Sequence, residues 1–146
     1  MWIIERIAAG ELDRAKELFD LLALVLGDQP GLLSDPYVDR LLQRDSFWAI
    51  TAIEQGRVIG GLTAHVLPMT NAKRAELLIY DIAVAEAHQR RGIGGALIEA
   101  ARREAASQGI EVVFVLADNQ DEHALRFYQK LGAIGSPVTL FEWNRR

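Results

Sequence analysis

Residues 89–95, Gln-Arg-Arg-Gly-Ile-Gly-Gly, constrain the fold of this chain more than any other stretch. They follow an apolar segment at 77–84, which has the pattern of a buried strand, and they precede a helical pattern at 96–107. A glycine-rich turn between a strand and a helix leaves backbone N–H groups unpaired at the positive end of the helix dipole. The sequence therefore predicts a strand–turn–helix unit that binds a phosphate or pyrophosphate, with Arg90 and Arg91 adding positive charge.

Three kinds of phosphate loop are distinguished by their spacing. A Walker loop needs Lys-Ser or Lys-Thr after its last glycine, and the chain contains neither pair. A dinucleotide fingerprint needs a third glycine where Leu97 stands. The remaining pattern, Gln/Arg-x-x-Gly-x-Gly/Ala, is matched by Gln89, Gly92 and Gly94. An ordinary glycine-rich turn with solvated arginines is the alternative, and the flanking strand and helix make it the weaker one.

A second motif covers residues 118–133, Asp-Asn-Gln-Asp-Glu-His-Ala-Leu-Arg-Phe-Tyr-Gln-Lys-Leu-Gly-Ala. We expect a strand at 111–116, a turn, and a helix at 121–131 that is closed by Gly132. Three- and four-residue spacings place Ala124, Phe127, Tyr128 and Leu131 on one helix face. Tyr128 is either a core aromatic residue or a functional hydroxyl, and within this motif we favour the functional role.

Composition limits the classes of function. The 146 residues suit a single domain, 1–146, and no segment approaches the roughly 20 apolar residues of a membrane span. The chain has no cysteine, and its three histidines lack metal-ligand spacing, so we expect no metal. The net charge of −4 argues against nucleic-acid binding and is compatible with a cationic ligand. The amino terminus lacks the features of a signal peptide, and we expect a cytoplasmic protein.

The remaining pattern predicts a fold in which strands and helices are mixed. Strands are expected at 3–7, 47–53, 58–67, 76–84, 111–116 and 138–143, and helices at 11–26, 36–43, 96–107 and 121–131. Residues 54–57 read as a hairpin turn. The resulting order is β-α-α-β-β-β-α-β-α-β. It combines hairpins with strand–helix–strand units, so we expect an α/β protein with a mixed sheet largely covered by helices.

The two motifs and the order of elements resemble the GCN5-related N-acetyltransferases, the GNAT superfamily of acyl-CoA N-acyltransferases. Residues 41–44, 64–68, 79–84, 86–93 and 115–118 look more narrowly like the aminoglycoside 3-N-acetyltransferases that acetylate gentamicin. The chain departs from that class at two places. It has His65 where the class has a tyrosine, and Asn119-Gln120 where the class has Tyr-Gly. Both positions lie near the expected acceptor cleft.

The resemblance implies acetyl-CoA as the acetyl donor and coenzyme A as product. The pantetheine arm would pair with the strand, the glycine loop would hold the pyrophosphate, and the second motif would contact the arm. The implied cofactor-binding residues are Ile82, Ala83, Val84, Gln89, Arg90, Arg91, Gly92, Ile93, Gly94, Gly95, Ala96 and Asn119.

The expected acceptor is a small polycation, because an aminoglycoside carries several ammonium groups that pair with carboxylates. Asp81 lies in an otherwise apolar strand, where a carboxylate needs a partner or a function. We expect Asp81 to act as general base and ammonium anchor and Tyr128 to protonate the leaving thiolate, in a direct transfer without an acyl-enzyme. The predicted substrate-binding residues are Asp35, Tyr80, Asp81, Asp118, Glu122 and Glu142.

Two other functions remain open at this point. The acceptor is alternatively a polyamine, an amino acid or a protein amine, and the chain is alternatively a non-catalytic sensor of acetyl-CoA. Aromatic residues such as Trp2 or Trp143 would suit the interface of a homodimer, and packing in the core explains them equally well.

Overall fold

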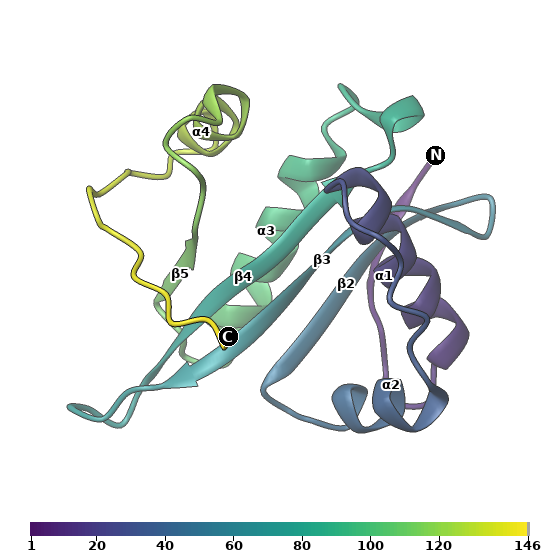
Figure 1. Ribbon diagram of the computed structural model, residues 1–146, viewed down its shortest axis with the longest axis horizontal. Helices are drawn as coiled ribbons and strands as arrows, with labels where there is room; N and C mark the ends of the chain where they lie inside the picture. The colour runs from purple at the N-terminus through teal and green to yellow at the C-terminus, as the bar shows by residue number, and fades with distance from the viewer. Residues whose placement is uncertain (146) are drawn as a thin grey trace. The chain divides into compact units, whose positions relative to one another are not determined.

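A computed structural model describes residues 1–145, which divide into two compact units, Met1–Leu116 and the residues from Ala117 onward. Within the described residues, the first unit contains a five-stranded sheet in the order β1-β2-β3-β4-β5 (Figure 1). Its strands β1 to β4 are antiparallel, and β5 pairs with β4 in parallel. The predicted mixed sheet is therefore confirmed. The strand bounds are β1 Ile3–Arg6, β2 Phe47–Glu54, β3 Arg57–Pro68, β4 Ala75–Val84 and β5 Val112–Val115.

Helices cover both faces of this sheet. Helices α1 (Leu12–Val25) and α2 (Asp35–Leu42) lie on one face, and α3 (Ile93–Ser107) lies on the other (Figure 1). A short 3-10 turn, η1 (Glu86–His88), connects β4 to the loop before α3, and α4 (Glu122–Lys130) is the helix of the second unit. No helix among residues 1–145 has both the length and the apolar character needed to span a membrane.

Burial on both faces explains why the central strands lack an alternating pattern. The first seven residues of β2 are all buried, and β3 is buried over most of its length. Residues Ala15, Leu18 and Leu22 of α1 pack against one face, whereas Trp48 and Leu97 are fully buried elsewhere in the core. A sheet packed on both faces excludes water from both sets of side chains, which is the main source of its stability.

Strand β4 has two irregularities that matter for the site. Thr63 of β3 pairs with Asp81 and the next residue, Ala64, pairs with Ile79, so Tyr80 is an extra residue in a β-bulge. On its other edge, β4 pairs with β5 only from Glu76 to Ile79, where the partner is Val115. Within residues 1–145, the last part of β4 therefore has a strand partner on one edge only.

Most predicted elements are confirmed, with small changes at their ends. The hairpin turn is a two-residue turn, with φ of 51° at Gln55 and 76° at Gly56, as the twist of a β-hairpin favours. Gly132 follows α4 with φ of 90°, as expected for a helix-ending glycine. Helix α3 starts at Ile93, three residues before the predicted start, because the left-handed Gly92 is its N-cap and the buried Ile93 is already helical.

The predicted last strand, 138–143, is wrong. The structure assigns no regular secondary structure to residues 133–145. The side chains of Val138, Leu140, Phe141 and Trp143 are each at least 71% exposed. Alternating apolar residues favour a strand only where a neighbouring strand satisfies the backbone groups, and no such pairing occurs among the described residues. Glu142 therefore does not lie on a strand.

An ion pair joins the β2–β3 hairpin to the glycine loop. The two oxygens of Glu54 accept hydrogen bonds from Nη1 and Nη2 of Arg91 at 3.0 and 2.8 Å. The amino group of Met1 lies 3.2 Å from Glu54 Oε1. These hydrogen bonds, that from Arg91 above all, lower the pKa of Glu54 to about 2. The pair is therefore ionised at any physiological pH.

Substitution of Gly61 by alanine should destabilise the protein by about 1–3 kcal/mol, as overpacking of a tight core does. A Cβ at Gly61 would lie 2.3 Å from Leu18 Cδ1 and 2.6 Å from the Ile50 carbonyl oxygen. Gly135→Ala is the control, because a Cβ there meets nothing within 4 Å. Urea denaturation measures both variants. Equal stability of Gly61→Ala and wild type would contradict the close approach of α1 to β3.

The Glu54→Gln variant should be less stable than wild type at neutral pH, and this difference should disappear in acid. Folding lowers the pKa of Glu54 from 4.5 to about 2. The ionised Glu54 therefore contributes fully to the free energy of unfolding when the pH is above 4.5. That contribution is lost as the pH falls through the lower value. Thermal melts of both proteins at a series of pH values measure the difference. A difference that stays constant down to about pH 2 would contradict the ion pair.

Candidate functional site

The glycine loop presents three unpaired N–H groups at the start of α3. Gly92 has φ of 80° and Arg90 has φ of 65°, so the backbone turns sharply on both sides of Arg91. The first backbone hydrogen bond of the helix runs from Ala96 N to Gly92 O at 3.1 Å. Within residues 1–145, the N–H groups of residues 93–95 therefore find no acceptor, and no side chain caps the helix. Such donors, at the positive end of a helix dipole, fit a phosphate or pyrophosphate.

Gln89 fixes the loop to the end of β4. Its side-chain Nε2 donates to the carbonyl oxygen of Val84 at 3.0 Å. The sequence predicted Gln89 as a cofactor ligand, and the structure shows its amide in contact with the protein backbone. This hydrogen bond therefore connects the glycine loop to the last residue of β4.

The end of β4 has an edge that is not covered by β5. Ala85 N donates to Ile59 O of β3 at 2.8 Å. Because successive backbone groups of a strand point to alternate edges, those of Val84 and Ile82 face the opposite edge. The β4–β5 ladder ends at Ile79, so the groups of Ile82 lie beyond it. An extended ligand can bind there as an added strand does.

Asp81 is a half-buried carboxylate on the same strand. It lies two residues from Ala83, which packs in the core beneath α1 and α2, so both side chains lie on that face of the sheet. Burial raises the pKa of Asp81, and the nearby charge of Asp28 raises it further. Asp28 itself follows Gly27, where α1 ends, and its N–H donates to Ala23 O at 2.8 Å. The helix end therefore holds a second carboxylate near Asp81.

A row of aromatic rings begins at α1 and continues across the sheet to the β-bulge. The ring centroids of Phe19 and Phe47 are 6.2 Å apart, and those of Phe47 and His65 are 5.4 Å apart. His65 in turn meets Tyr80 edge-on at 5.5 Å. Tyr80, the extra residue of the bulge, is 65% exposed. The row ends beside Asp81 with a ring that a ligand can reach.

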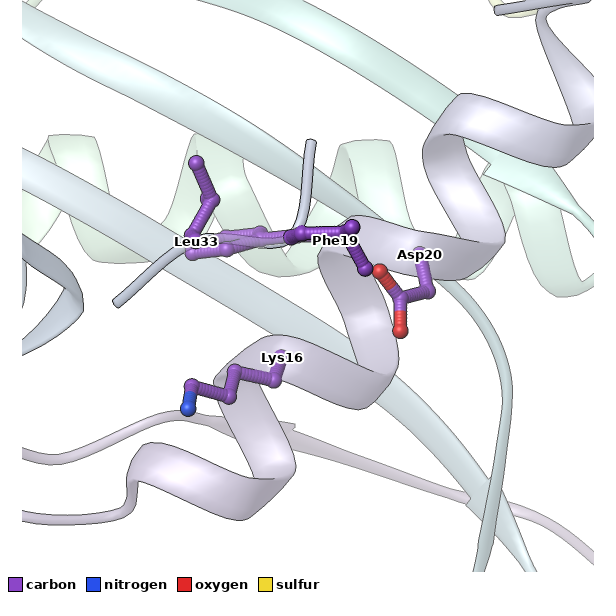
Figure 2. Close-up of a pocket in the computed structure, with 5 residues that line it drawn as sticks. Lys16, Phe19, Asp20 and Leu33 are labelled. Carbon is purple, nitrogen blue, oxygen red and sulfur yellow. The ribbon is translucent and has the colours of Figure 1, made fainter. Parts of the chain in front are cut away.

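A hollow of about 290 Å³ lies between α1 and the loop that leads to α2. Figure 2 shows Lys16, Phe19 and Asp20 along α1, with Leu33 opposite them. Its lining has one cation and one anion, so it does not select for positive charge. Asp35, a predicted substrate ligand at the start of α2, is exposed and ion-paired with Lys16.

The predicted site residues of the second unit are mostly engaged in local turns or exposed. Asp118 Oδ1 accepts from Gln120 N at 2.8 Å, and Asp121 Oδ1 caps α4 by accepting from Ala124 N at 3.1 Å. Asn119, Glu122 and Glu142 are exposed. Residues 1–145 contain no group of three or more acidic or histidine side chains that could hold a metal ion.

Tyr128 is a half-buried residue of α4. Its ring meets that of Phe127 at 5.1 Å. Burial raises the pKa of Tyr128, and the charge of Asp121 contributes to the same shift. The hydroxyl group therefore stays protonated at neutral pH and is available as a proton donor.

Three features of the first unit lie on or beside strand β4. They are its free edge, the glycine loop that follows it, and the neighbouring carboxylates of Asp81 and Asp28. Sequence reasoning missed two features of this arrangement. The bulge at Tyr80 has no local sequence signal. Glu54 and Arg91 are 37 residues apart in the sequence, so their pairing depends on the register of the hairpin and could not be predicted from local sequence.

Comparisons with known proteins support these observations. The model of the acetyltransferase (GNAT) family matches residues 16–133. An uncharacterised N-acetyltransferase, YvbK, of Bacillus subtilis (strain 168) is 32% identical over 130 residues, covering 87% of this chain and 73% of the relative.

Solved structures of two proteins from uncultured soil metagenomic samples are similar over nearly their whole length. The aminoglycoside acetyltransferase HMB0005 has a TM-score of 0.94 and 33% identity, with 100% of this chain and 99% of that chain covered. The aminoglycoside acetyltransferase meta-AAC0020, in complex with trehalose, has a TM-score of 0.95 and 31% identity, with 99% and 97% covered. The same enzyme in complex with sisomicin has a TM-score of 0.94. The family model, the curated relative and the fold agree, and the chain belongs to the acetyltransferase (GNAT) family.

Proposed function

We propose that this protein transfers an acetyl group from acetyl-CoA to the 3-amino group of an aminoglycoside such as gentamicin, with antibiotic resistance as the consequence. The observation that carries the proposal is the half-buried Asp81, which shares strand β4 with the free edge that leads to the glycine loop. Two proteins of 31–33% identity, whose solved structures cover nearly the whole chain, are aminoglycoside acetyltransferases, and one of them is solved in complex with sisomicin.

The residues present fit acetyl-CoA, which supplies an acetyl group activated as a thioester. The N–H groups of residues 93–95 and the charge of Arg90 would hold the pyrophosphate. Backbone groups of Ile82 and the N–H of Val84 would pair with the pantetheine arm, since the Val84 carbonyl oxygen already accepts from Gln89. The resemblance of the second motif implies Asn119 as a further ligand of the arm. Ala83 lies between the two pairing residues, and Gly92, Ile93 and Ala96 shape the loop and the first turn of α3.

Asp81 is the proposed general base. An amine that is protonated in water must lose a proton before its nitrogen can attack a thioester. An aspartate with the ordinary pKa of about 3.9 is a weak base at neutral pH, whereas the raised pKa of Asp81 makes its Oδ atoms better proton acceptors. The nearby carboxylate of Asp28 adds negative charge that attracts an ammonium group to the same place.

Tyr128 is the proposed acid. It would donate its hydroxyl proton to the leaving thiolate, the role that the resemblance of the second motif implies. A phenol and a thiol have reference pKa values of about 10 and 8.5, so the donation need only be partial as the thiolate departs. The raised pKa of Tyr128 keeps the hydroxyl protonated at neutral pH and makes complete transfer of its proton to the thiolate less favourable.

The acceptor is proposed to be a polycation because two carboxylates lie near each other where it would bind. Asp81 and Asp28 lie together on the α1 side of the sheet, and Tyr80 offers an exposed ring beside them. Asp118, Glu122 and Glu142 of the second unit stay candidates for further ammonium groups, whereas the carboxylate of Asp35 is engaged by Lys16.

A thiol-release assay with acetyl-CoA should show turnover with gentamicin and sisomicin, and much weaker turnover with spermidine or a lysine peptide. Mass spectrometry and NMR of the gentamicin product should place the acetyl group on the 3-amino nitrogen. Turnover only with spermidine or the peptide would overturn the aminoglycoside assignment and keep the transferase. Tight binding of acetyl-CoA without turnover of any acceptor would favour a sensor.

The variants Asp81→Asn and Tyr128→Phe should each reduce kcat with gentamicin by about 10²–10⁴-fold, the usual effect of losing a general base or acid. Their dissociation constants for coenzyme A should stay close to that of wild type. The control is Asp13→Asn, an equal change of charge at an exposed residue in the first turn of α1. Undiminished turnover of Asp81→Asn would remove its assignment as base and leave it at most an ammonium anchor.

A further inference from the structure

Arg91 lies in the glycine loop, but its guanidinium group is occupied by the protein. Two parallel hydrogen bonds, at 2.8 and 3.0 Å, join it to Glu54 at the end of β2. The Glu54 side chain is only 16% exposed, and that of Arg91 is 38% exposed. A two-pronged pair of this kind fixes the orientation of the arginine as well as its position. Arg91 Nη1 also lies 3.0 Å from His88 Nδ1, so the guanidinium group has a second partner within the protein.

The hairpin that carries Glu54 is itself fixed to α1. Arg14 Nη1 donates to the carbonyl oxygen of Gly56 at 3.1 Å, in the turn of the hairpin. The N–H of Val58 donates to Glu17 Oε2 at 2.8 Å, on the following strand. The support for Arg91 therefore comes from a hairpin bound to the helix layer, and not from a free loop.

Arg90 and Arg91 differ in whether their side chains are engaged by other residues of the protein. Arg90 is exposed and forms no hydrogen bond or ion pair with any residue from 1 to 145. Its φ of 65° is unusual for a residue with a side chain, and such a conformation persists only where neighbouring contacts hold it. Arg91 is the next residue and supplies such contacts. The charge of Arg91 is largely cancelled by Glu54, whereas the charge of Arg90 is not.

We propose that Glu54 is a positioning residue for cofactor binding. It holds Arg91, and through Arg91 it keeps the N–H groups of residues 93–95 oriented for a polyphosphate. Arg90 then provides the direct positive charge. This inference rests on the proposed use of acetyl-CoA and is independent of the acceptor.

The opposite role for Glu54 predicts an effect of the opposite sign. If Arg91 were itself the phosphate ligand, Glu54 would compete with the phosphate for it. Removing a negative charge near a site for a polyanion would then tighten binding, as simple electrostatics requires. A positioning role predicts weaker binding despite the more favourable charge, because the loop loses its support.

Isothermal titration of coenzyme A measures this difference without any acceptor or turnover. Glu54→Gln should weaken binding by roughly three- to tenfold, the scale expected for residues coupled in one network. The control is Glu99→Gln, which makes the same change of charge on α3. Its partner Arg102, at 2.6 Å, belongs to the same helix and not to the loop. This control should bind coenzyme A within about twofold of wild type.

Variants of the arginine complete the test. Arg91→Lys keeps the charge but cannot form the two-pronged pair, so it should weaken binding as Glu54→Gln does. The double variant Glu54→Gln/Arg91→Lys should be no weaker than the weaker single variant, since both act on one interaction. Circular dichroism and thermal melts ensure that binding is measured below the melting temperature of each variant.

The outcomes separate this inference from the proposed function. Tighter or unchanged binding in Glu54→Gln, or an equal loss in Glu99→Gln, would overturn the positioning role alone. Failure of the wild-type protein to bind coenzyme A would overturn the proposed cofactor and this inference with it. Binding by wild type without acetylation of gentamicin would overturn only the aminoglycoside assignment.

Discussion

The unequal pairing of β4 is the constraint on which the rest of the site depends. One edge of this strand follows β3 as far as Val84, whereas the other edge follows β5 only to Ile79. Backbone groups that no strand satisfies must meet a side chain, as the Val84 carbonyl meets Gln89, or else water or a ligand, because leaving them unpaired in the interior costs free energy. The fold therefore leaves a gap in its own hydrogen bonding, and the glycine loop with its unpaired N–H groups lies directly after it.

The two carboxylates beside β4 show how the fold sets an electrostatic environment. A bulge inserts Tyr80 into β4 next to Asp81, and a helix-ending glycine places Asp28 near that carboxylate. The sequence singles out Asp81 as a carboxylate in an apolar strand, but it does not indicate that Asp28 lies near it. Their proximity raises the pKa of Asp81 beyond the effect of burial, and the same proximity favours a ligand with positive charge. The acid–base property and the preference for a cation therefore have one cause.

Local patterns were sufficient for most elements of this fold. The apolar stripe of α1, the Gln-Gly turn of the hairpin and the glycines around α3 each depend on neighbouring residues, and the structure confirms them. Features that depend on distant partners were not predictable. The segment 138–143 has a strand pattern and forms no strand within the described residues, because pairing requires a neighbour that the pattern does not specify. The bulge at Tyr80 and the Glu54–Arg91 pair likewise depend on how neighbouring strands are aligned, which local sequence does not specify.

The two-residue turn at Gln55–Gly56 has a consequence for how the hairpin can vary in length. Surface hairpins usually tolerate inserted or deleted residues, because their tips lie in solvent and affect little else. Here the pairing of Glu54 with Arg57 fixes which side of the sheet the Glu54 side chain reaches. One residue more or less in β2 would turn that side chain to the opposite face, since side chains alternate along a strand. A region that is otherwise free to change in length is thus held to one length by a contact with the glycine loop 37 residues away.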